Sequence, residues 1–208
     1  MNKQLQQKLK TLPRSPGVYF HKSASGEIIY IGKAAVLKNR VRQYFQSSKD
    51  FDAKTRALVA EIYDTDWIET ESEIDALFLE SEMIKRYMPR YNILLRDDKS
   101  QTFVRIDMKS EWPTVSFTHN PADDGAEYIG PFYNGFALKK ALRYLRRVFP
   151  YLTRQRRPGQ STLDEDLGLS PRLSDGPAAY KATLRKLISY IKGNRKAIAA
   201  ELERDMKT

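Results

Sequence analysis

Two short apolar segments near the start of the chain alternate in the manner of β-strands. They are GVYFHK at 17–22 and EIIYIGK at 27–33, and the small polar stretch SASG at 23–26 between them predicts a four-residue hairpin loop. With that loop Lys22 pairs with Glu27, and Tyr19 lies opposite Tyr30. The two tyrosines then share one face of the hairpin, where they either pack in the core or form part of a site. The other face is aliphatic and consists of Val18, Phe20, Ile29 and Ile31.

Helical periodicity appears on both sides of this hairpin. The first helix is predicted from Lys3 to Leu12, before Pro13, and AVLKNRVRQYF at 35–45 predicts a second helix. Its apolar stripe consists of Leu37, Val41, Tyr44 and Phe45. Arg40 lies at the edge of that stripe and points toward the domain, where it is either a surface arginine or part of a site.

A further helix is predicted from Ser72, which begins a sequence similar to a capping box, to Met88, before Pro89. Glu80 lies inside its apolar stripe, with Ala76, Leu77, Met83 and Ile84 as its helical neighbours. A carboxylate in such surroundings needs a cation or hydrogen bonds. Two readings remain open: an ion pair with Arg40, or a metal ligand.

The second half of the chain is less regular. Extended segments are predicted at 102–106, 114–117 and 127–132, followed by a basic helix at 137–148. The Pro/Gly/Ser-rich stretch 154–177 is predicted to be a linker, and a helix breaks at Gly193 within the helical tail 178–208. The expected fold is α/β of the α+β type: a small central antiparallel sheet flanked by helices in domain 1–98, then a strand and basic-helix extension at 99–153.

The net charge of the chain and its distribution indicate the class of partner that it binds. The net charge is +10, and residues 128–163 hold eight Lys/Arg and no acid. Such basic stretches with interleaved aromatic residues favour nucleic-acid binding, because neutralised phosphates release counterions. DNA is therefore the expected partner, with contacts from basic side chains: Lys38, Arg42, Lys139, Lys140, Arg143, Arg146 and Arg147.

Several functional classes are excluded by composition. The chain has no cysteine and only two histidines, so thiolate metal sites and cysteine nucleophiles are absent. Its apolar runs are too short for a membrane span, and MNKQLQQKLK has no apolar segment of signal-peptide length. We expect a soluble, cytoplasmic protein.

Taken together, these motifs resemble the GIY-YIG endonucleases. GVY at 17–19 and YIG at 30–32 match the two tripeptides that name the family. PRYNILLRDDKS at 89–100 and IGPFYNG at 129–135 are similar to the branch that contains the UvrC component of the bacterial UvrABC excinuclease and its short single-nuclease homologues. The similarity runs from about residue 10 to 150.

The resemblance implies a catalytic set: Tyr19, Tyr30, Lys33, Arg40, Tyr44, Glu80 and Asn92. Glu80 would hold one divalent metal, Mg²⁺ or Mn²⁺. Tyr30, or Tyr19 beside it, would take a proton from the attacking water, with Lys33 favouring the phenolate. Arg40 would neutralise the scissile phosphate, and Tyr44 and Asn92 would orient phosphate and water.

Gly17 and Gly32 would let the DNA backbone approach closely. No iron–sulfur cluster is expected, because the cysteine-rich segment of many relatives is missing here.

The resemblance predicts a DNA endonuclease that makes the incision on the 3′ side of a lesion in nucleotide excision repair. The UvrA and UvrB components of the excinuclease are candidate partners, although the helical hairpin that docks UvrB is absent, which makes docking to UvrB doubtful. Two alternatives stay open: a GIY-YIG nuclease that acts on branched or mobile-element DNA, and a non-catalytic nucleic-acid-binding protein on the same fold. Whether the chain stands alone or is a fragment also stays open.

Overall fold

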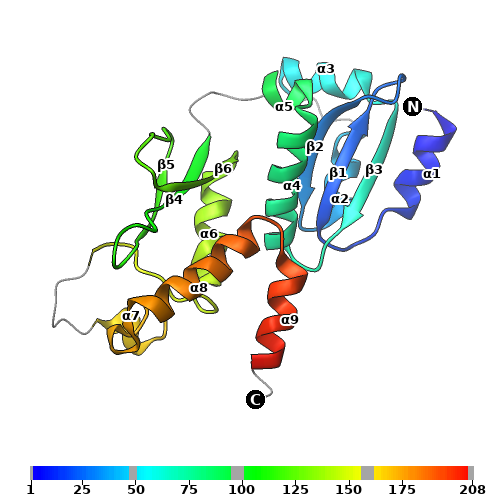
Figure 1. Cartoon of the computed structure of the whole chain (residues 1–208). Helices are drawn as coiled ribbons and strands as arrows, with labels where there is room; N and C mark the ends of the chain where they lie inside the picture. Colours follow the sequence, from blue (N-terminus) through cyan, green and yellow to red (C-terminus); the bar gives the residue numbers. More distant parts are fainter. Residues whose placement is uncertain (1, 47–50, 95–100, 156–161, 206–208) are drawn as a thin grey trace. The chain divides into compact units, whose positions relative to one another are not determined.

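The computed structural model describes residues 2–46, 51–94, 101–155 and 162–205 (Figure 1). It consists of two compact units, Met1–Asp98 and Lys99–Thr208. Each unit contains one three-stranded antiparallel sheet with helices beside it. The predicted α+β fold with a helical tail is thereby confirmed.

The sheet of the first unit has the order β2-β1-β3. The predicted hairpin is present as β1 (Gly17–Lys22) and β2 (Ile28–Ala34), with β1 in the centre. The third strand, β3 (Asp64–Glu69), was not predicted. It pairs antiparallel with β1 and leaves β2 as an edge of the sheet.

The predicted register of the hairpin was wrong. Tyr19 lies opposite Gly32 and not Tyr30, because β2 contains an irregularity where His21 pairs with Tyr30 and Lys22 with Ile28. Ile29 is thereby left without a partner on β1, as in a β-bulge, and it joins the core cluster of Tyr19 instead of the opposite face. Elsewhere in the hairpin the observed pairing differs from the predicted pairing by two residues. Because side chains alternate with a period of two, Tyr19 and Tyr30 still share a face.

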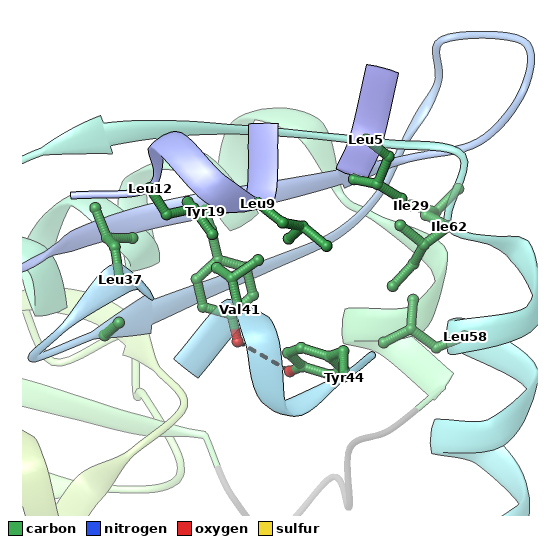
Figure 2. Close-up of a cluster of buried hydrophobic side chains, with 11 residues drawn as sticks. Leu5, Leu9, Leu12, Tyr19, Ile29, Leu37, Val41, Tyr44, Leu58 and Ile62 are labelled. Atoms are coloured by element: carbon green, nitrogen blue, oxygen red, sulfur yellow. Dashed lines mark hydrogen bonds between the residues drawn. The ribbon is translucent and has the colours of Figure 1, made fainter. Parts of the chain in front are cut away.

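Helices cover both faces of this sheet. On the tyrosine face α1 (Lys3–Thr11), α2 (Leu37–Gln43) and α3 (Ala53–Glu61) contribute to one core cluster, which Figure 2 shows around Tyr19 and Val41. Val18, Phe20 and Ile31 alternate with the tyrosines and are buried on the opposite face. The helices α4 (Glu73–Tyr87) and α5 (Arg90–Leu94) pack against β2. The predicted stripe of α2 is confirmed, since Leu37, Val41 and Tyr44 are buried.

The start of α4 follows the predicted capping pattern. Ser72 is the N-cap, its Oγ accepts a hydrogen bond from Asp75 N at 3.1 Å, and it donates to Asp75 Oδ2 at 2.7 Å. Such a cap stabilises a helix by about 1 kcal/mol. The helix ends at Tyr87, before the left-handed residue Met88 and Pro89, so the segment that carries Glu80 is fixed at both ends.

The second unit contains the three strands expected from its sequence. They are β4 (Thr102–Ile106), β5 (Val115–Thr118) and β6 (Glu127–Phe132), in the order β5-β4-β6. The basic helix α6 (Gly135–Leu145) follows, with Asn134 accepting a hydrogen bond from Ala137 N as its N-cap. Its buried residues lie on one side: Leu138, Ala141, Leu142 and Leu145.

The rest of the chain is helical. The segment predicted as a linker contains a short helix α7 (Leu163–Asp166) and a 3-10 turn η2 (Leu173–Asp175). Then α8 (Gly176–Ile191) and α9 (Arg195–Asp205) form the tail, separated at Gly193 as predicted. Parts of three segments named from the sequence lie outside the described residues: 95–100 of the motif at 89–100, 156–161 of the linker and 206–208 of the tail. Within the described ranges, no helix has the length and apolar character needed to cross a membrane.

Candidate active site

Three tyrosines from two strands and a helix meet on the α2 side of the sheet. Tyr19 comes from β1, Tyr30 from β2 and Tyr44 from the end of α2, and their ring centroids are 5.9 to 6.2 Å apart. The hydroxyls of Tyr19 and Tyr44 are joined by a hydrogen bond of 2.9 Å, drawn in Figure 2. The ring of Tyr19 is fully buried, whereas Tyr30 is partly buried. The three tyrosine side chains therefore contribute their rings to the core and their hydroxyls to a polar cluster.

Arg40 is the cation of this cluster. It is on α2, one turn before Tyr44, and its guanidinium carbon lies 5.5 Å from the centroid of the Tyr44 ring. The side chain remains exposed and donates to Gln43 Oε1 at 3.1 Å. Burial lowers the pKa of Arg40, but the hydroxyls of Tyr19 and Tyr44 outweigh that effect and raise it. A charged, accessible guanidinium therefore lies beside the tyrosine hydroxyls.

Glu80 reaches the edge strand β2 from α4. Its Oε1 accepts a hydrogen bond from the backbone N–H of Lys33 at 2.9 Å, and the side chain is half-buried. Its predicted apolar neighbours Ala76, Leu77, Met83 and Ile84 are all buried. The carboxylate thus accepts a hydrogen bond from the N–H group of Lys33, on the open edge of the sheet.

The surroundings of Tyr30 and Tyr19 favour the neutral form of their hydroxyls, because burial raises the pKa of both. Burial raises the pKa of Tyr30, and Tyr44 and Glu80 raise it further, while Arg40 lowers it. Burial likewise raises the pKa of Tyr19. Lys33, which we expected to favour the phenolate, pairs with Val18 and so projects from the opposite face of the sheet. The cation that acts on the tyrosines is Arg40.

Asn92 is used to support the edge strand. Its Oδ1 accepts from Ile31 N at 2.7 Å and its Nδ2 donates to Ile31 O at 2.8 Å, and the residue is buried. The side-chain amide therefore pairs with β2 as a further strand would. In this arrangement Asn92 positions the strand that carries Tyr30, and its expected contact with phosphate or water stays a prediction.

The two glycines of the motifs are surrounded by the protein itself. A Cβ atom at Gly32 would lie 2.4 Å from the hydroxyl oxygen of Tyr19, and one at Gly17 would lie 2.3 Å from the backbone oxygen of Ile68. We expected these positions to admit the DNA backbone. The structure gives the need for glycine another origin, because Gly32 makes room for the Tyr19 side chain.

His21 belongs to the same cluster, although no role was predicted for it from the sequence. It is fully buried, with its ring centroid 5.1 Å from that of Tyr19 and 4.8 Å from that of Tyr44. Its Nδ1 shares a hydrogen bond of 2.9 Å with Thr65 Oγ1, while Nε2 is buried and has no hydrogen-bond partner among the described residues. The sequence held a signal for it, since His21 alternates with Tyr19 onto the same face.

His21 should make the first unit sensitive to mild acid. Burial, and next the charge of Arg40, lower the pKa of His21 from 6.5 to about 3. The unfolded chain therefore binds a proton below pH 6.5 that the folded chain refuses, and stability falls as pH decreases toward 3. We expect a loss on the order of 1 kcal/mol for each pH unit between 6 and 4, absent in His21→Leu.

Urea unfolding followed by Trp67 fluorescence, in a Trp112→Phe background, measures this in the first unit. His119→Leu, in the second unit, is the matched control and should keep the wild-type pH dependence. Equal pH dependence in the wild type and His21→Leu would contradict the assignment.

The basic residues expected to contact DNA fall into different settings. On α2, Arg42 donates from Nε to the backbone oxygen of Leu9 at 3.1 Å, and Lys38 is partly buried. On α6 and just after it, four of the side chains are exposed: Lys139, Lys140, Arg143 and Arg147. Arg146 differs, because it is bonded internally to Asp164, Ser170 and the backbone of Tyr151.

The three-stranded antiparallel sheet carries clustered tyrosines, with an arginine beside them and a carboxylate bound to the sheet edge, as expected for a domain of the GIY-YIG class. Comparison with known families places it more closely. Residues 15–93 match the UvrC-like GIY-YIG domain. These residues are therefore a UvrC-like GIY-YIG endonuclease domain, which confirms the resemblance expected from the sequence.

Relatives extend this similarity along the chain. It is 38% identical to UvrABC system protein C of Clostridium acetobutylicum over 96% of its own length and 33% of the relative's. The protein of the same name from Clostridium perfringens is 40% identical over 97% of this chain and 34% of the relative. The chain thus spans about a third of the length of these relatives.

A solved structure is also similar. It is the GIY-YIG N-terminal endonuclease domain of UvrC from Thermotoga maritima, bound to its catalytic divalent cation, magnesium. The match has 36% identity and a TM-score of 0.39, and it covers 44% of this chain and 99% of that domain.

Proposed function

We propose that this protein is a divalent-metal-dependent DNA endonuclease that makes the 3′-side incision in nucleotide excision repair. The observation that carries the proposal is the grouping of Tyr19, Tyr30 and Tyr44 with Arg40 and Glu80 in a UvrC-like GIY-YIG domain. The similarity to UvrABC system protein C along nearly the whole chain supports the assignment to repair, with DNA, UvrA and UvrB as its partners.

The donor set suits a magnesium-type ion. Glu80 is bound to the edge of β2 and its charge acts on Tyr30, so it would be the protein's carboxylate ligand at this site. Mg²⁺ commonly binds through one or two carboxylates and keeps several waters. When bound, the ion would supply positive charge beside the scissile phosphate and its departing 3′-oxygen.

Tyr30 is the better placed of the two candidate bases. It is partly accessible, whereas the hydroxyl of Tyr19 is buried and bonded to Tyr44. In the proposed reaction Tyr30 takes a proton from the attacking water, and its oxygen must first lose its own proton. Burial raises the pKa of Tyr30, and Arg40 favours that loss because it counteracts part of this rise. Tyr19 and Tyr44 hold the cluster in place, and Arg40 also neutralises the phosphate.

The test is nicking of a duplex that contains one bulky lesion, with the strand labelled at one end to locate the cut. We expect cutting on the 3′ side of the lesion in Mg²⁺, none in EDTA, and weak cutting without UvrA and UvrB. Cutting in EDTA would contradict the metal requirement. Efficient lesion-specific cutting by the isolated chain would contradict the dependence on partners.

A further inference from the structure

The helix α6 has an outer face that the nuclease site does not explain. Its inner face is buried through Leu138 and Leu142. On the outer face Phe136 is 81% exposed and Tyr144 is 52% exposed. Exposed aromatic side chains that lie along one helix and are rimmed by polar residues are typical of a surface that binds another molecule.

Basic side chains lie between and beside these aromatic residues. Lys140 is four residues from Phe136 and four from Tyr144, so the three side chains follow one another along the same face. Three more cations surround them: Lys139, Arg143 and Arg147. In the part of the chain that the structure describes, none of these four cations forms a salt bridge, and residues 128–163 contain no acid.

A third exposed aromatic residue lies next to this helix. Phe117 on β5 is 36% exposed, and the Nζ atom of Lys139 lies 5.7 Å from the centroid of its ring. This contact directs one of the cations along the sheet side of α6. Arg146 is not part of the surface, because its side chain is only 13% exposed and its guanidinium is paired with Asp164.

We propose that the outer face of α6, defined by Phe136, Lys140, Arg143, Tyr144 and Arg147, binds an unpaired segment of DNA. Alternating aromatic rings and cations are what single strands require, since each base offers a face for stacking and each phosphate a charge. The proposal rests on the proposed function, in which DNA is the substrate, and it specifies the strand state that this surface selects.

The spacing of the rings favours a single strand over a duplex. Eight residues of helix separate Phe136 from Tyr144 by about 12 Å along the axis, far more than the 3.4 Å rise between stacked bases. Each ring would therefore hold a different, separated base, with Lys140 and Arg143 at the phosphates between them. Bases in a duplex are already stacked on each other and are not open to such rings.

The density of cations argues against a protein partner, because charged residues are depleted from the centres of protein interfaces.

The experiment is a binding titration by fluorescence anisotropy in EDTA, on a Glu80→Gln background, so that cleavage does not interfere. The probes are a labelled oligothymidine and a hairpin duplex of equal charge. We expect Phe136→Ala combined with Tyr144→Ala to weaken oligothymidine binding tenfold or more and duplex binding less than twofold, without changing the salt dependence. Lys140→Gln with Arg143→Gln should weaken both probes and reduce the salt dependence.

Val148→Ala is the matched control, since Val148 is an exposed apolar residue just beyond the same helix and 50% exposed. It should bind both probes as the wild type does. Equal losses for both probes in the aromatic variant, or no loss for either, would overturn the proposal. Retained DNA binding together with loss of self-association in that variant would assign the face to protein contacts instead. Because no metal is present, these results are independent of whether the chain cuts DNA.

Discussion

Replacing Glu80 by Gln is expected to lower the rate of Mg²⁺-dependent nicking at least about 100-fold. Glutamine keeps the shape of the side chain, and its amide oxygen can still accept the hydrogen bond that Lys33 N donates to Glu80 at 2.9 Å. The negative charge needed to hold a cation is lost, and charge stabilisation by a catalytic metal is worth several kcal/mol. The measurement is single-turnover nicking over a range of Mg²⁺ concentrations, with thermal unfolding as the check on folding.

Glu82→Gln is the matched control. Glu82 is exposed on the same helix, near Lys85 and Arg86, and its loss should change nicking less than twofold. A Glu80→Gln protein that cuts at the wild-type rate would remove Glu80 from the proposed site. Loss of cutting in both variants would point to a general effect of charge on α4.

The faces of the hairpin could be predicted from the sequence, but its register could not. Alternation alone put Tyr19 and Tyr30 on one side, and a shift of two residues does not change the side. The bulge at Ile29 depends on how the turn closes: Ser23 N donates to Glu27 O at 2.9 Å, and Gly26 has a φ of 84°. No pattern of apolar positions reports that closure. The predicted face of Ile29 was wrong for this reason.

The strand β3 was missed because its sequence, DTDWIE, is unfavourable for a strand on its own. Its acids are stabilised by contacts distant in sequence. Asp66 accepts from Lys22 Nζ at 2.5 Å and from Lys8 Nζ at 2.6 Å, and these two lysines lower its pKa. Tertiary ion pairs thus override a poor local preference, and only the folded structure shows them.

The candidate site was predictable wherever a polar residue lay among apolar ones. Glu80 was predicted from its apolar helical neighbours and Arg40 from its place at the edge of an apolar stripe. Arg40 lies at the tyrosine cluster, and Glu80 lies at the strand edge beside it. Asn92 has no such local pattern, and its contact is with the backbone of a strand 61 residues earlier. The role of Gly32 also depends on a partner, the Tyr19 ring, that only the true register brings opposite it.

Replacing Arg40 by Ala is expected to reduce nicking about 100-fold or more and to move the pH dependence of the rate upward. The first effect follows from losing a cation aimed at the phosphate, which commonly costs a factor of about 10²–10³. The second follows from the tyrosines, because burial raises the pKa of Tyr30 and Tyr19 and Arg40 counteracts part of that rise. Without it a higher pH is needed to ionise Tyr30, so the rising limb of the pH–rate profile shifts to higher pH.

Two companion variants separate these effects from loss of structure. Arg40→Lys keeps the positive charge but loses the planar guanidinium with its paired donors. The rising limb of its pH–rate profile should therefore stay close to the wild-type position, while its rate is reduced. Asn39→Ala, an exposed neighbour on α2, should change neither. Because Arg40 is itself exposed, its replacement should leave thermal unfolding nearly unchanged. A lower rate with an unmoved pH limb would leave Arg40 as a phosphate ligand and separate it from the ionisation of Tyr30.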